Sequence, residues 1–189
     1  MFHVLPNEVP ILFVLGLISL QLREGSWRAG FHWPDSWRRT ILLAVAAAVL
    51  LQLKSVVTEP IGDWIWHRPQ EVSSTLRDIS SVKVVVQRLG LVWTFAAFGE
   101  EVAYRGYLMR RAGDAFKWSP AGCAFALLWS SILFGFGHYY KGPSGVFEST
   151  VSGLVLGAAY LLTRRVLWAP VLAHGLSDTF AVVASYFGL

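Results

Sequence analysis

The sequence predicts an all-α integral membrane protein, a polytopic helical bundle of about six spans around an intramembrane polar cavity. Hydrophobic residues make up 54% of its 189 residues and charged residues only 15%, against roughly 25% charged residues in soluble domains. The apolar residues come in runs, and most of the charged residues lie between these runs. Runs of this kind suit a bilayer, because a spanning helix needs about 20 mostly apolar residues.

The N-terminal part, residues 1–83, contains two predicted spans and an interfacial segment. The first apolar run covers about residues 9–22 and the second about residues 40–57. We expect Glu59-Pro60 to end the second helix, because proline cannot continue the helical hydrogen-bonding pattern. Residues 60–83 are mixed and rich in tryptophan, which predicts an interfacial helix and loop.

Four more spans are predicted in the core, about residues 84–189. They cover about residues 84–109, 121–137, 146–163 and 166–189. Gly153 and Gly157 predict a small-x-x-x-small face for helix packing. Because the chain is long enough for one domain and nothing in the sequence indicates two, residues 1–189 are expected to form a single integral membrane domain.

The net charge of +4 does not indicate a nucleic-acid-binding protein. Lys and Arg form short clusters at the ends of apolar runs, and tryptophans lie at the same ends. Cationic flanks and an aromatic belt at the membrane interface explain both patterns. The expected partner is therefore the lipid bilayer, and no nucleic acid is expected.

Six polar residues inside the apolar runs are the candidates for function. They are Glu100, Glu101, Arg105, His138, His174 and Asp178. An ionisable group at the centre of a membrane helix costs about 2.5 to 3.5 kcal/mol, and lipid offers it no partner. We therefore expect these side chains to face one another or a water-filled cavity.

Helical spacing sorts these residues. Glu101 and Arg105 are four residues apart, so they can form an ion pair on one helix face. His174 and Asp178 have the same spacing, which lets the carboxylate orient the imidazole. Glu100 points about 100° away from Glu101 around the helix axis. A second carboxylate beside one that is already paired is not needed to stabilise the structure. The simplest assembly brings Glu100 together with both histidines and the aspartate inside the bundle.

This set of residues suits hydrolysis. A carboxylate beside an imidazole can deprotonate a water molecule as a general base, and a second histidine can donate to the developing oxyanion. Water is the expected nucleophile. Cys123 lies four helical turns from His138, and Ser177 does not share a helix face with His174, so neither side chain is placed to be activated by a histidine. A zinc site formed by Glu100, His138 and His174 is the open alternative.

Three motifs in order resemble the membrane proteases that include the type II CAAX prenyl endopeptidases and the bacteriocin-processing (CPBP, or Abi) proteins. The family pattern is Glu-Glu-x-x-x-Arg, then Phe-x-x-x-His, then His-x-x-x-Asn/Asp on successive membrane helices. In this chain the motifs occupy residues 100–105, 134–138 and 174–178. The resemblance extends from about residue 98 to the C-terminus.

The resemblance implies a glutamic-type intramembrane endopeptidase that needs no metal or other cofactor. Its expected partner is a membrane-anchored protein or peptide that is prenylated, otherwise lipidated or hydrophobic. The expected location is the inner (plasma) membrane of a prokaryotic cell, with several membrane spans. Hydrolysis and transfer of the cut chain to another acceptor both stay open.

The resemblance also implies a role for each residue. Glu100 would be the general base, and His138 would help to bind and activate the water. His174 and the residue four positions later would form the oxyanion site. Arg105 would hold Glu101 or the substrate in place.

Asp178 departs from the usual family pattern. The prenyl endopeptidases typically carry Asn at this position, and an ionised Asp cannot donate a hydrogen bond to an oxyanion. Asp178 is therefore expected either to be protonated or to act only by orienting His174.

Two other functions fit the sequence. An ion-coupled transporter also places ionisable groups at the membrane midplane, although the second half of the chain does not repeat the first. A non-catalytic bacteriocin-immunity or scaffold protein of the same fold would tolerate the loss of Glu100 or His138.

Straight helices would leave the candidate residues at different depths. Glu100 would lie near mid-span, with His174 toward one membrane face and His138 toward the other. At 1.5 Å per residue these depths differ by on the order of 10 Å. Assembly of the site therefore requires a late start or a break in the helix that carries His138, or else span boundaries that differ from those given above, which is the alternative that we favour.

Overall fold

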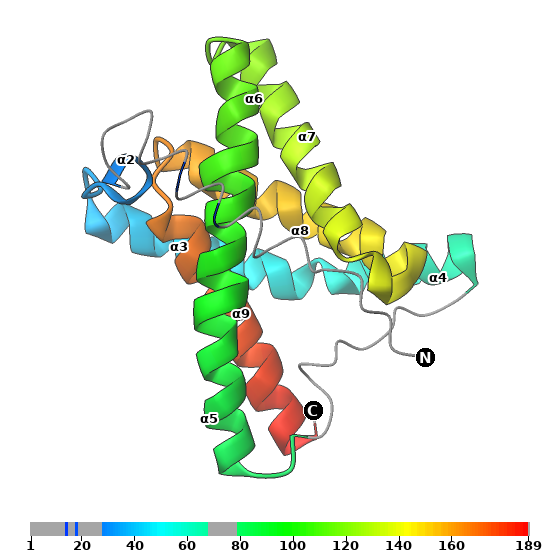
Figure 1. The fold of residues 1–189 in the computed structure, drawn as a ribbon. Coiled ribbons are helices and arrows are strands. Elements are labelled where there is room, and N and C mark those ends of the chain that lie inside the picture. The colour runs from blue at the N-terminus through cyan, green and yellow to red at the C-terminus, as the bar shows by residue number, and fades with distance from the viewer. Residues whose placement is uncertain (1–13, 15–17, 19–27, 68–78, 189) are drawn as a thin grey trace.

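The all-α class is confirmed by a computed structural model, which describes Val14, Ile18, residues 28–67 and residues 79–188. These residues form helices and connecting turns, with no strand among them (Figure 1). The first predicted span, about residues 9–22, lies largely outside the described residues.

The number of spans differs from the prediction. In the described part of the chain, four helices rather than six are long and apolar enough to cross a membrane. They are Trp37–Trp66, Val82–Ala115, Pro120–Gly137 and Tyr139–Leu162. The C-terminal helix α9 (Trp168–Phe187) is not among them, because His174, Ser177 and Asp178 reduce its hydropathy. The chain is a multi-pass membrane protein, but the prediction of about six spans is wrong for the described residues.

Three helices precede the core of the protein. They are α2 (Arg28–Phe31), α3 (Trp37–Leu53) and α4 (Ser55–Trp66). The Ser36 side chain caps α3 by accepting a hydrogen bond from the Arg39 backbone N–H at 3.3 Å, as is common at helix N-termini.

The predicted helix end at Glu59-Pro60 is wrong, because Pro60 lies inside α4. A proline removes one backbone donor from a helix, but α4 packs along α8 (Gly142–Leu162). A Cβ on Gly62 would lie 3.2 Å from the Ser144 Cβ. This close tertiary contact carries the helix past the proline as far as Trp66.

The central helix is continuous from Val82 to Ala115 and is longer than predicted at both ends. It consists of α5 (Val82–Leu91), the π-helical segments η2 (Val92–Glu100) and η3 (Val102–Met109), and α6 (Arg110–Ala115). Glu101 lies between the two π-helical segments. Such segments are rare and often occur at functional sites.

The helix α7 (Pro120–Gly137) is followed by a 3₁₀ turn, η4 (Tyr139–Lys141), and then by α8. The two long helices of this hairpin pack through glycines. A Cβ on Gly153 would lie 2.8 Å from the Ser131 Cα, and one on Gly157 would lie 2.5 Å from the Leu127 Cδ1. The predicted packing face at Gly153 and Gly157 is therefore confirmed.

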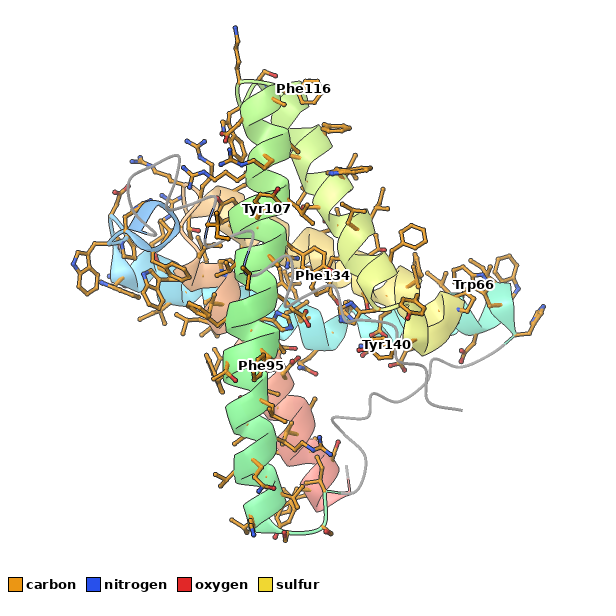
Figure 2. All side chains as sticks on the ribbon, in the orientation of Figure 1. Trp66, Phe95, Tyr107, Phe116, Phe134 and Tyr140 are labelled. Atoms are coloured by element: carbon orange, nitrogen blue, oxygen red, sulfur yellow. The ribbon has the colours of Figure 1, made fainter. Side chains whose placement is uncertain are left out.

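The last helix, α9, packs against both α3 and η2, so it connects the N-terminal helices to the central helix (Figure 1). A Cβ on Gly175 would lie 2.5 Å from the Trp93 ring, so only glycine fits this contact. Aromatic side chains separate into two sets in Figure 2. Phe134 is 3% exposed and lies among the helices, whereas Phe95 and Phe116 are more than half exposed and point outward, as lipid-facing residues do.

Candidate functional site

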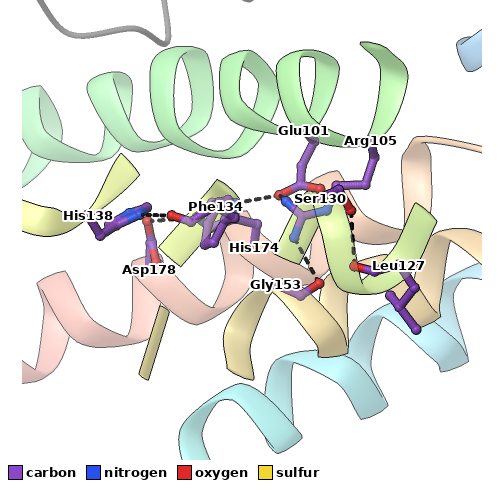
Figure 3. A network of polar contacts seen from close by, with 9 residues as sticks. All are labelled: Glu101, Arg105, Leu127, Ser130, Phe134, His138, Gly153, His174 and Asp178. Atoms are coloured by element: carbon purple, nitrogen blue, oxygen red, sulfur yellow. Dashed lines mark hydrogen bonds and ion pairs between the residues drawn. The ribbon is translucent and has the colours of Figure 1, made fainter. Parts of the chain in front are cut away.

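The predicted polar residues come from three helices that converge around Phe134 (Figure 3). Glu100 and Glu101 lie on the central helix, His138 follows the last residue of α7, and His174 lies on α9.

Glu101 is the centre of the network and is fully buried. Its Oε1 accepts a hydrogen bond from Arg105 Nη1 at 2.8 Å and contacts His174 Nδ1 at 2.8 Å. Arg105 is also fully buried, and its Nη2 donates to the Gly153 carbonyl at 3.0 Å. The predicted Glu101–Arg105 ion pair is confirmed, and through these contacts it connects the central helix, α8 and α9.

The Phe134 ring packs against the cationic and imidazole side chains of the site. The Arg105 guanidinium lies 4.7 Å from the ring centroid, a cation–π distance. The His138 and His174 ring centroids lie 4.7 and 6.1 Å from it. Phe134 therefore gives the polar groups an apolar wall, a role that the sequence indicated only through its place in the Phe-x-x-x-His motif.

His174 lies between two carboxylates. A carboxylate only accepts hydrogen bonds, so the contact with Glu101 requires a proton on Nδ1. The other ring nitrogen, Nε2, lies 3.6 Å from Asp178 Oδ2. This distance allows an ion pair but exceeds that of a hydrogen bond. The predicted pairing of His174 with Asp178 is confirmed, whereas the contact with Glu101 was not predicted.

Glu100 and Glu101 each have a buried Oε2 without a hydrogen-bond partner among the described residues, but Glu101 uses its other oxygen to contact Arg105 and His174. The charges of His174, Asp178 and Lys141 act on the Glu100 carboxylate. Burying a polar atom without a partner is costly, and such an atom in a folded protein requires an explanation. A water molecule or a substrate group beside Glu100 would supply the missing partner.

His138 has one ring nitrogen engaged and one free. Nδ1 lies 2.8 Å from the Phe134 carbonyl, which can only accept, so Nδ1 carries a proton and Nε2 is left as an acceptor. The charges of His174 and Arg105 act on the ring. The helix that carries His138 neither starts late nor breaks, because α7 runs without interruption from Pro120 to Gly137. The predicted bounds of the central span were wrong instead, since that helix extends from Val82 to Ala115.

A fourth helix contacts the site next to Asp178. The Gln52 amide of α3 donates to both the carbonyl and the hydroxyl of Ser177, each at 2.9 Å. On the other side of α9, the Trp93 indole donates to the Thr179 hydroxyl at 3.1 Å. Sequence reasoning missed these contacts, although a glutamine in an apolar run was a signal for one of them.

The predicted zinc ligands are not arranged as a metal site. Among the described residues, no three His, Cys, Asp or Glu side chains are placed to hold a metal ion. The intramembrane cavity stays a prediction. A surface hollow among the described residues lies elsewhere, on α5, and its lining includes Val84, Gln87, Arg88 and Leu91.

Residues 83–180 match the family model described as type II CAAX prenyl endopeptidase Rce1-like. The match covers slightly more than half of the chain and includes the whole polar network except for Gln52. No curated protein and no solved structure matches the chain.

Proposed function

Because this chain belongs to the type II CAAX prenyl endopeptidase Rce1-like family, we propose that it hydrolyses a peptide bond near the C-terminus of a prenylated membrane protein. A CAAX sequence is a C-terminal tetrapeptide whose cysteine carries the prenyl group. The prenyl chain would hold the substrate in the bilayer beside the site. The observation that carries the proposal is Glu100 Oε2, which is buried, has no hydrogen-bond partner among the described residues and belongs to a carboxylate outside the Glu101–Arg105 ion pair.

In the proposed reaction, Glu100 is the general base. A water molecule donates one hydrogen bond to Glu100 and the other to His138 Nε2. As Glu100 takes a proton, the water oxygen bonds to the scissile carbonyl carbon. The C–N bond then breaks, and the proton passes from Glu100 to the leaving amine. General-base catalysis of this kind contributes about 10²- to 10⁴-fold to the rate.

His174 is the proposed oxyanion donor. With Nδ1–H directed at Glu101, a second proton on Nε2 would be free for the substrate, because Asp178 is too distant to accept it in a hydrogen bond. Two flanking carboxylates favour this doubly protonated ring electrostatically. Asp178 would thus orient and charge-balance His174 rather than donate to the oxyanion itself.

Glu101 and Arg105 are proposed as positioning residues. Both side chains are fully buried, and each contacts a second helix as well as its pair partner. They would hold α8 and α9 against the central helix so that the base and the oxyanion donor face the same substrate atom. No cofactor enters this mechanism, and the inner membrane of a prokaryotic cell stays the expected location, which membrane fractionation tests.

The test uses purified protein in liposomes with a farnesylated CAAX peptide, and mass spectrometry detects the products. Wild type and the control Glu59→Gln, a substitution at an exposed site on α4, should cleave the peptide. Glu100→Gln and His138→Ala should lose at least about 10²-fold in rate while keeping wild-type stability.

Three results would redirect the proposal. Equal cleavage by wild type and both site variants would exclude the roles assigned to Glu100 and His138. No cleavage by any protein would favour a non-catalytic immunity or scaffold protein, or an ion-coupled transporter. Loss of cleavage on adding a zinc chelator, with recovery on adding zinc, would favour the metal-dependent alternative.

A further inference from the structure

Lys141 lies beside the candidate site in the turn that follows His138. It is the last residue of η4, and its backbone N–H donates to the His138 carbonyl at 2.9 Å. The turn therefore fixes the backbone of Lys141 relative to His138, at the junction of α7 and α8. This placement is local and does not depend on a long flexible connection.

The aliphatic part of the Lys141 side chain packs on Gly145. A Cβ on Gly145 would collide with the Lys141 Cβ and would lie 3.3 and 3.4 Å from its Cγ and Cδ. Because Gly145 has no side chain, the lysine stem can lie against the first turn of α8. Lys141 is consequently half-buried rather than extended into solvent.

The Lys141 ammonium lies outside the ion pairs formed by the described residues, yet it acts electrostatically on both Glu100 and His138. By contrast Arg105, a second cation that acts on His138, is paired with Glu101. Among the described residues, the site therefore has one cation within an ion pair, Arg105, and one outside any ion pair, Lys141.

We propose that Lys141 binds the C-terminal carboxylate of the substrate and so selects peptides that end close to the scissile bond. This inference rests on the proposed endopeptidase function. In a CAAX sequence the free carboxylate lies three residues beyond the prenylated cysteine, which is at most about 10 Å of extended chain. Every bond within the tetrapeptide therefore lies within that distance of the carboxylate.

A lysine suits this role. Its ammonium is a compact charge on a flexible stem, so it can follow the carboxylate of tetrapeptides with different side chains. Bringing an unpaired carboxylate to the membrane is costly, and a cation outside the ion pairs of the described residues lowers that cost. An amide or an extended C-terminus would lose this pairing.

The experiment compares two farnesylated peptides that are identical except for a C-terminal carboxylate or a C-terminal amide. Wild type should cleave the acid with a kcat/KM about 10- to 100-fold above that for the amide, mainly through KM. Lys141→Met should bring this ratio close to one by raising KM for the acid. Lys141→Arg should keep most of the preference, because it keeps the charge.

Two further variants test whether the preference for the acid depends on the charge and the position of the Lys141 side chain. Lys83→Met removes an exposed cation on α5 and should leave the ratio unchanged. Gly145→Ala displaces the lysine stem without removing the charge and should lower the ratio. A wild type that does not distinguish acid from amide, or a Lys141→Met protein that still does, would overturn the assignment.

Binding measurements separate this assignment from the proposed function. If wild type cleaves neither peptide, hydrolysis fails as the function, and equilibrium binding of the same two peptides decides the role of Lys141. Tighter binding of the acid by wild type but not by Lys141→Met would support the assignment. Equal binding of acid and amide by wild type would refute it.

Discussion

Replacing Arg105 tests the buried network most sharply, because both partners of its ion pair are fully buried. In Arg105→Met, Glu101 keeps only its contact with His174, and the Gly153 carbonyl loses its side-chain donor. Breaking a buried pair by removing one partner costs about 3 to 5 kcal/mol. We expect a loss of that size in the free energy of unfolding.

A double variant shows whether the unpaired charge causes the loss. Arg105→Met combined with Glu101→Gln removes both charges, so it should be more stable than Arg105→Met alone by about 1 to 3 kcal/mol. Stability can be measured by unfolding in mixed detergent micelles, followed by tryptophan fluorescence. The exposed Arg38→Met is the control and should change stability by less than about 0.5 kcal/mol.

Two outcomes would contradict this reasoning. An Arg105→Met protein within about 0.5 kcal/mol of wild type would mean that the pair does not hold the helices together. A double variant less stable than the single one would mean that Glu101 is stabilised by groups other than Arg105.

Three further predictions follow from the packing. Gly153→Ala should destabilise the fold by about 1 to 3 kcal/mol. Gly90 has open space around it, so Gly90→Ala should be neutral or stabilise the fold by up to about 1 kcal/mol. Equal effects of the two variants in the unfolding assay would contradict the packing face at Gly153. Gln52→Leu removes two hydrogen bonds to α9 and should cost about 0.6 to 1.7 kcal/mol in the same assay, and an unchanged stability would show that these bonds are not formed. Gly175→Ala should lower peptidase activity by pushing on the Trp93 ring, and Trp93→Leu in the same chain should restore it; failure to restore activity would rule out this contact as the cause.

Local sequence signals predicted several helices well. The predicted span at about residues 121–137 corresponds to α7. The structure explains its start, because the Ser119 hydroxyl accepts a hydrogen bond from the Gly122 N–H at 3.1 Å and Pro120 occupies the first helical position. Pro60 was misleading, because packing of α4 on α8 outweighs the loss of one helical hydrogen bond. The predicted span at about residues 166–189 is not among the candidate spans because the polar residues of α9 reduce its hydropathy.

Contacts within one helix were easier to predict than contacts between helices. The i,i+4 pairs at Glu101–Arg105 and His174–Asp178 follow from helical spacing and are present. The partner of His174 on the central helix could not be predicted in this way, because the 100° per residue of an α-helix does not hold in π-helical segments. The position of Lys141 depends on the turn after α7, which spacing alone does not determine.

The most direct test of the central claim is cleavage of a farnesylated CAAX peptide in H₂¹⁸O by wild type and by Glu100→Gln. Water activated by Glu100 predicts that wild type places one ¹⁸O atom in the new C-terminal carboxylate and that Glu100→Gln forms no product above background. Labelled product from Glu100→Gln at the wild-type rate would contradict the role of Glu100. Wild-type product without ¹⁸O would contradict hydrolysis and indicate transfer to another acceptor.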